Sequence, residues 1–176
     1  MNSKRSWKAV AAGCLVAASF MLSDMAFAQA DPRVATSMAS LKAMATKMGA
    51  PKLEGKEAVG GKDAPALYFG TRKMNNDFEI VDAVSKEDGK GMTATFFVKS
   101  GDEFVRVSTS VPKPDGSGRA IGTVLDPNGK AIAEIRRGKP FYGEVAILGT
   151  PYVTGYEPML DAAGNVIGIY YVGYKK

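Results

Sequence analysis

Histidine is absent from the 176 residues of the chain, which also holds only one cysteine, Cys14, and one tryptophan, Trp7. The sequence therefore lacks the side chains of Ser-His and thiol nucleophiles, of imidazole proton shuttles and of most zinc or iron sites. Its aspartates do not form the dense pattern of a calcium-binding loop. These absences predict a protein without cofactor or metal that is not an enzyme. The enzyme alternative, which is the least favoured, would have to rely on carboxylate side chains alone.

The charge of the chain is modest. Lys and Arg number 23 against 18 Asp and Glu, a formal net charge of +5. The basic residues are scattered along the chain and form no stripe of the kind that follows a nucleic-acid backbone. No nucleic-acid partner is predicted.

The N-terminus has the three parts of a secretory signal peptide. Lys4, Arg5 and Lys8 precede an apolar run at residues 9–22, and Ala26-Phe27-Ala28 follows. The apolar run is shorter than the roughly 20 residues of a spanning helix, so a retained anchor is the less favoured alternative. We predict a signal peptide at residues 1–28 and a periplasmic or secreted soluble protein of single-domain size.

Residues 29–65 are predicted to contain an N-terminal helix and a linker. The helix is expected at residues 31–48, after an Asp cap and a proline at its first position. Its apolar residues recur every three or four positions, which favours packing on the sheet of the same chain or a helix-helix seam in a homodimer: Val34, Met38, Leu41, Met44 or Ala45, and Met48. Residues 52–63, rich in glycine and charge, are predicted to form a loop.

The remaining chain, residues 66–176, reads as short strands with turn signals between them. A short crossing helix is predicted at residues 126–138, and a hairpin turn at Gly149-Thr150 would pair Ile147 with Tyr152. A helix followed by an antiparallel sheet of about five strands is an α+β fold. The predicted strands are residues 66–69, 78–85, 93–99, 103–110, 142–148, 152–159 and 166–174.

One arginine and a group of hydroxyl-bearing side chains are the candidate ligand-binding residues. Strand alternation places Arg106 and Ser108 on one face of their strand, and an unpaired buried charge in mid-strand would call for an anion. Tyrosines offer an apolar wall and one polar tip, which suits a small organic ligand. The alternatives are a solvated or internally paired arginine and tyrosines that only cover the sheet. The complete candidate set is Arg106, Ser108, Tyr142, Tyr152, Thr154 and Tyr156.

Three segments resemble a single Cache sensor domain of the Cache 3/Cache 2 fusion type, as in the extracytoplasmic part of bacterial methyl-accepting chemotaxis receptors. They are "GDEFVRVSTSV" (residues 101–111), "FYGEVAILGTPYVTGYEPML" (residues 141–160) and "AGNVIGIYYVGY" (residues 163–174). The resemblance implies a PAS-like sheet behind a long N-terminal helix and favours a pocket role for Arg106.

The resemblance also implies a function in extracytoplasmic signal sensing. Such a domain binds a small metabolite, an organic acid or a similar compound. A chemoreceptor would re-enter the membrane after the last strand, whereas this sequence stops two residues after Tyr174. We therefore expect binding to be reported through a partner, a membrane receptor or a kinase. The alternative is a non-enzymatic interaction or assembly module whose pocket is vestigial.

The exported protein is predicted to begin at Gln29 or Asp31, after cleavage behind Ala28 or Ala30. The intact mass of the protein recovered from the periplasmic fraction checks this. Recovery of the full-length chain from membranes alone would contradict the soluble form.

Overall fold

The computed structural model describes residues 31–87 and 91–176. The predicted signal peptide, residues 1–28, lies outside the described residues. The part described is an α+β fold built on antiparallel sheets, as predicted. Its elements, in chain order, are α1 (Pro32–Thr46), β1 (Pro51–Val59), β2 (Lys62–Phe69), β3 (Arg72–Lys73), α2 (Glu79–Glu87), β4 (Met92–Ser100), β5 (Glu103–Thr109), α3 (Lys130–Arg136), β6 (Phe141–Ile147), β7 (Thr150–Leu160) and β8 (Val166–Lys175).

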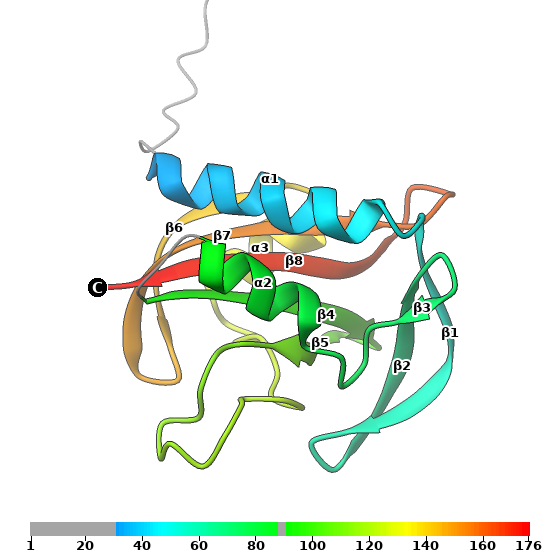
Figure 1. Cartoon of the computed structure of the whole chain (residues 1–176), viewed down its shortest axis with the longest axis horizontal. Coiled ribbons are helices and arrows are strands. Elements are labelled where there is room, and N and C mark those ends of the chain that lie inside the picture. The colour runs from blue at the N-terminus through cyan, green and yellow to red at the C-terminus, as the bar shows by residue number, and fades with distance from the viewer. Residues whose placement is uncertain (1–30, 88–90) are drawn as a thin grey trace, which may run out of the picture.

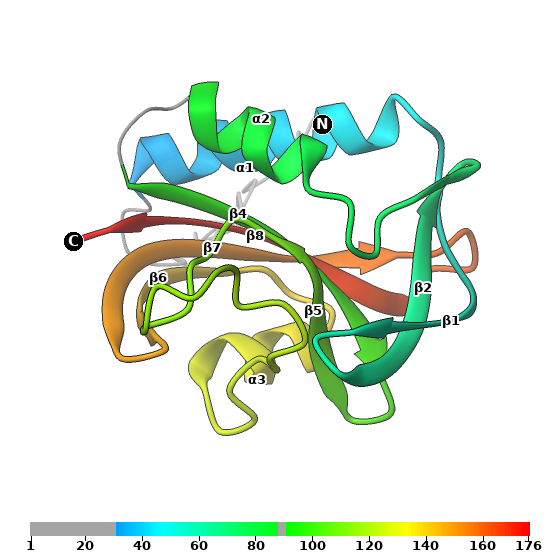
Figure 2. The same cartoon turned by 60° about the horizontal axis from the view of Figure 1, so that its bottom comes forward.

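The central layer is a five-stranded antiparallel sheet in the order β5-β4-β8-β7-β6. Helices α1 and α2 lie side by side on one face, while α3 and its flanking loops lie on the other (Figure 1, Figure 2). The apolar residues form one core on each face. The order and the two layers are compatible with the predicted PAS-like sheet, and the second, helix-poor face is the one that holds the candidate site.

Helix α1 forms where the sequence predicts a helix. The Asp31 carboxylate accepts a hydrogen bond from the Arg33 amide, and Pro32 occupies the first turn, where its missing N–H costs nothing. The chain leaves the helix through Gly49, whose φ of 129° suits glycine. The long N-terminal helix implied by the resemblance stays a prediction, because the residues before 31 are not described.

The apolar stripe of α1 is buried within the chain, which decides between its two predicted roles. The helix contacts α2, β7 and β8, and Leu41 is 0% exposed. A side chain already enclosed by its own sheet is not free to form a helix-helix seam, so the homodimer predicted through this stripe is not supported. The stripe residues buried are Val34, Met38, Leu41 and Ala45, with Met44 and Met48 packed beside them.

Residues 78–85, predicted as a strand, form α2 instead. The Asp77 carboxylate accepts a hydrogen bond from the Glu79 amide at 3.0 Å and so caps the first turn. The short apolar run fits the two-residue period of a strand and the 3.6-residue period of a helix. Its buried residues are one, three and four positions apart, as on one face of a helix. The buried residues are Ile80, Val81 and Val84.

The predicted loop at residues 52–63 is a hairpin of β1 and β2 and part of a separate three-stranded sheet. Gly60 and Gly61 form its two-residue turn, with φ of 56° and 82°. Positive φ at both positions defines the type I′ turn, for which Gly-Gly is a strong signal. The sequence reads as a loop because β1 is an exposed edge strand, rich in charge and interrupted by a bulge.

The β6–β7 hairpin forms as predicted, but its turn lies one residue earlier, at Leu148–Gly149. Both residues have positive φ, 49° and 85°, and Ile147 pairs with Thr150 rather than with Tyr152. The register is therefore shifted by two residues. A shift of two leaves every side chain on its predicted face, because the period of a strand is two.

Among the described residues, no helix has the length and hydropathy needed to cross a bilayer.

Replacing Leu41 with Asp is expected to lower the free energy of unfolding by more than about 3 kcal/mol, since the carboxylate would be enclosed without a partner. Ala39 is exposed on the same helix, so Ala39→Asp is the matched control and should change stability by less than about 0.5 kcal/mol. Urea denaturation measures both. A stably folded, monomeric Leu41→Asp protein would contradict intramolecular packing of the stripe.

Candidate ligand-binding cavity

A β-bulge in β5 decides where Arg106 points. Phe96 pairs with Ser108, whereas the next residue, Phe97, pairs with Arg106, so Val107 is an extra residue in β5. Phe96 and Phe97 belong to the cores on opposite faces of the sheet. Arg106 and Ser108 therefore point to opposite faces, and the prediction that they share one face is wrong because simple alternation does not hold across a bulge.

The Arg106 guanidinium is buried without an ionic partner. The residue is 3% exposed, and among the described residues no carboxylate oxygen lies within 4.0 Å of its nitrogens. Its Nη1 donates to Thr123 Oγ1 at 2.6 Å, and the group lies 4.8 Å from the centroid of the Phe97 ring. Its Nε has no hydrogen-bond partner within residues 31–87 and 91–176. Burial lowers the pKa of Arg106, a sign that its charge is poorly compensated.

Residues 120–125 run along the free edge of β5 and hold Arg106 from that side. The Arg106 amide donates to the Thr123 carbonyl, and the Gly122 amide donates to the Arg106 carbonyl, both at 2.9 Å. The Leu125 amide likewise donates to the Phe104 carbonyl. The segment therefore supplies both the backbone cover of the sheet edge and the hydroxyl that positions the guanidinium.

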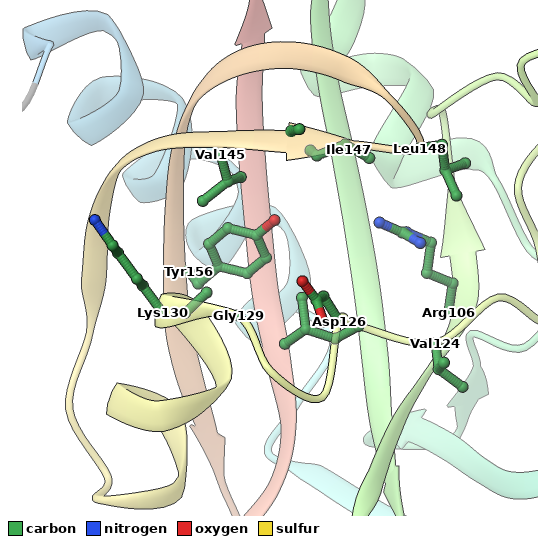
Figure 3. A pocket seen from close by; sticks show the side chains of 12 residues that line it. Arg106, Val124, Asp126, Gly129, Lys130, Val145, Ile147, Leu148 and Tyr156 are labelled. Carbon is green, nitrogen blue, oxygen red and sulfur yellow. The ribbon is translucent and has the colours of Figure 1, made fainter.

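A cavity of about 260 Å³ opens in front of Arg106, between the β6–β7 turn and the start of α3 (Figure 3). In Figure 3 the Arg106 guanidinium and the Tyr156 hydroxyl point toward one another, with the Asp126 carboxylate at the near side. The rest of the wall is largely apolar. The lining residues are Arg106, Val124, Leu125, Asp126, Gly129, Lys130, Ala131, Val145, Ala146, Ile147, Leu148 and Tyr156.

Three tyrosines, Tyr152, Tyr156 and Tyr171, lie close enough to Arg106 to interact with its charge. Tyr156 packs on Tyr171, with ring centroids 4.9 Å apart, and both are buried. Burial raises the pKa values of Tyr156, Tyr152 and Tyr171, and the positive charge of Arg106 lowers each of them in part. The three phenols stay neutral, so they supply polarity near Arg106 but no counter-charge.

The structure divides the six predicted residues into three groups. Arg106 and Tyr156 line the cavity. Tyr152 lies in the same core cluster as Tyr156, close enough to interact with the charge of Arg106, but it does not line the cavity. Thr154 shares that face, and its hydroxyl donates to the Gly143 carbonyl at 2.8 Å.

Ser108 and Tyr142 lie away from the cavity, on the helix-covered side of the sheet. The Ser108 hydroxyl donates to the Asp77 carbonyl, next to α2. The Tyr142 hydroxyl donates to the Glu157 carboxylate, which also pairs with Lys42 of α1. Tyr142 precedes Gly143 on β6 and faces opposite to the cavity-side residues Phe141 and Val145. Their hydrogen bonds are structural ones between the sheet and the helices.

Several cavity residues were not predicted. Asp126 and Gly129 fall at the start of the helix predicted at residues 126–138, and Leu148 falls at the end of the strand predicted at residues 142–148. The positions of such loop residues depend on chain path rather than on periodicity, so the sequence carries no signal that they meet Arg106.

The sequence profile of the Cache 3/Cache 2 fusion domain matches residues 21–176. The chain therefore belongs to the Cache 3/Cache 2 fusion domain family, whose members are extracytoplasmic sensor domains. No curated protein shows significant similarity to the chain.

Replacing Arg106 with Met is expected to leave the stability of the ligand-free protein unchanged or raise it by about 1 kcal/mol, because it removes a buried charge without a partner. Arg119 pairs with Asp82 through both carboxylate oxygens, so Arg119→Met should instead cost about 1 kcal/mol. Thermal and urea unfolding measure the two variants. A loss of several kcal/mol in Arg106→Met would show that Arg106 serves the fold.

Proposed function

We propose that the chain is a periplasmic or secreted Cache sensor domain that binds a small organic acid on Arg106 and reports its binding to a partner, a membrane receptor or a kinase. The ligand is bound and released unchanged, so the protein is not an enzyme. Family membership supports the sensor role. The cavity supports the binding of a small molecule.

The observation that carries this proposal is the free Nε of a buried guanidinium beside a cavity. An uncompensated buried charge costs several kcal/mol, and a native fold retains such a group where something else compensates it. A carboxylate fits the planar fork of arginine with two parallel hydrogen bonds. With Nη1 already bound to Thr123, the ligand would take the edge formed by Nε and Nη2. Nε is enclosed in the ligand-free protein, so the proposed binding includes a small shift of the side chain or its cover.

The surroundings fit a small ligand that is held in one orientation. The volume of about 260 Å³ lies just below the usual range for drug-sized ligands, roughly 300–1,000 Å³. Tyr156 offers a neutral hydroxyl across from the guanidinium (Figure 3). A charged anchor and one neutral hydrogen-bonding group are sufficient to orient a small acid.

A route from the cavity to the far end of the fold supports reporting to a partner. Gly122, next to Thr123, touches Gly60 at the tip of the β1–β2 hairpin so closely that a Cβ at Gly122 would lie 2.6 Å from the Val59 carbonyl oxygen. At the base of that hairpin Gly70 makes an even closer contact, because a Cβ there would lie 2.0 Å from the carbonyl oxygen of Met48, just beyond α1. The β1–β2 hairpin thus contacts the segment that holds Arg106 at its tip and the end of α1 at its base. A ligand-induced shift of that segment would therefore move the hairpin and could reach α1.

The second candidate function is an interaction module with a vestigial cavity. A more open groove of about 250 Å³ between α1, α2 and β3 favours it, because Met44, Met48 and Ile80 line the groove and methionine adapts to varied partners. In that case no small acid would bind at Arg106.

Thermal-shift measurements with acetate, hexanoate, succinate, citrate and glutamate should find an acid that stabilises the protein, by about 2.7 kcal/mol at one hundred times its dissociation constant. Calorimetric titration of that acid should then show affinity weakened at least roughly tenfold in Arg106→Ala. Arg106→Lys should recover only part of it, since an ammonium lacks the fork.

Arg137 is exposed and lies outside the cavity, so Arg137→Ala serves as the control and should bind like the wild type. Equal affinity in Arg106→Ala and the wild type, or no stabilisation by any of the acids, would contradict the proposal and leave the interaction module as the better account.

A further inference from the structure

Leu148 sits at the mouth of the cavity in an unfavourable conformation. It is the first residue of the two-residue β6–β7 turn, with φ of 49°. Such a turn favours Asn, Asp or Gly, because a bulky side chain is strained at positive φ. The only other described residue besides glycine with positive φ is Asn76, a type that tolerates this region.

The side chain of Leu148 is also 40% exposed. A single exposed leucine is ordinary, but this one lies at a strained position and lines the cavity (Figure 3). Neither strain nor exposure stabilises the turn. Backbone strain of this kind concentrates at ligand clamps. The most direct explanation of a strained and exposed Leu148 is therefore contact with a bound ligand.

The cavity wall indicates the chemistry of that ligand. Arg106 is its only buried cation, and aliphatic side chains of the cavity-side core, such as Val145 and Ile147, line the cavity beside it. The exposed Asp126 carboxylate lies on the near side of the cavity in Figure 3 and disfavours any anion there, but only the carboxylate bound to Arg106 has a cation to offset this repulsion. A second carboxylate would be repelled without compensation. Lys130 is exposed as well, and in Figure 3 its chain extends away from Arg106, beyond Tyr156.

We propose that the cavity selects a monoanion with an apolar body, an aliphatic or aromatic monocarboxylate, and that Leu148 covers this body at the mouth. The inference rests on the proposed function, since it assumes that the carboxylate binds to Arg106. It adds that a second negative charge on the ligand would weaken binding and that a longer apolar chain would strengthen it.

Calorimetric titration with acetate, hexanoate and adipate tests the selectivity in the wild type. Hexanoate and adipate have equally long chains and differ by one terminal carboxylate, while acetate has no apolar body. Each buried methylene strengthens binding roughly fourfold, so hexanoate should bind at least about tenfold more tightly than acetate. Adipate should bind at least about tenfold more weakly than hexanoate.

Leu148→Asn tests the residue itself. Asn tolerates positive φ, so the melting temperature should be unchanged or higher, while hexanoate affinity should fall roughly fivefold or more and acetate affinity should stay the same. Leu160 is 45% exposed on β7 outside the cavity, and Leu160→Asn, the matched control, should leave both affinities unchanged. A structural role alone would not separate hexanoate from acetate.

The outcomes distinguish the two levels of the account. If none of the acids binds, succinate, citrate and glutamate included, or if Arg106→Ala binds the stabilising acid as the wild type does, the proposed function fails and this inference with it. If succinate, citrate or glutamate binds and hexanoate does not, the inference alone is overturned. If Arg106→Ala loses binding but adipate binds as tightly as hexanoate, or Leu148→Asn leaves hexanoate affinity unchanged, the inference alone is overturned.

Discussion

A buried positive charge without a counter-ion among the described residues, the Arg106 guanidinium, organises the cavity side of this molecule. The bulge at Val107 turns Arg106 to that face, and residues 120–125 fix it through Thr123 without supplying a carboxylate. The neighbouring tyrosines are neutral, because burial raises their pKa values. The fold thus encloses the arginine side chain and holds it in place but leaves its positive charge uncompensated. An anionic ligand would supply the missing negative charge.

The opposite face of the sheet shows that the same chain can compensate its charges. There Lys42 pairs with Glu157, which also accepts a hydrogen bond from Tyr142, and Arg119 is held by both oxygens of Asp82. These groups join the helices to the sheet and are satisfied within the protein. The contrast between the two faces argues that the isolation of Arg106 belongs to binding rather than to a general shortage of acidic residues.

The sequence predicted most of the fold but only two of the residues that line the cavity, Arg106 and Tyr156, and the failures have particular physical causes. Periodicity located α1, the strands of the main sheet and the tyrosine face, because these depend on local alternation. It misassigned α2, whose short apolar run fits both periods, and β1, whose exposed edge carries no apolar pattern. Ser108 was misplaced by a bulge that single-strand alternation does not reveal. Leu148 and Asp126 reach the cavity through loop geometry that periodicity does not encode.

The central claim is that the free Nε edge of Arg106 receives an anion. The most direct measurement is a ¹H–¹⁵N correlation spectrum of the arginine Nε–H groups during titration with hexanoate, with chloride as the control anion. The account predicts that the Arg106 signal moves saturably with hexanoate and not with chloride, while the signal of the ion-paired Arg119 stays in place. An Arg106 signal that does not move, or arginine signals that all drift together with ionic strength, would contradict it.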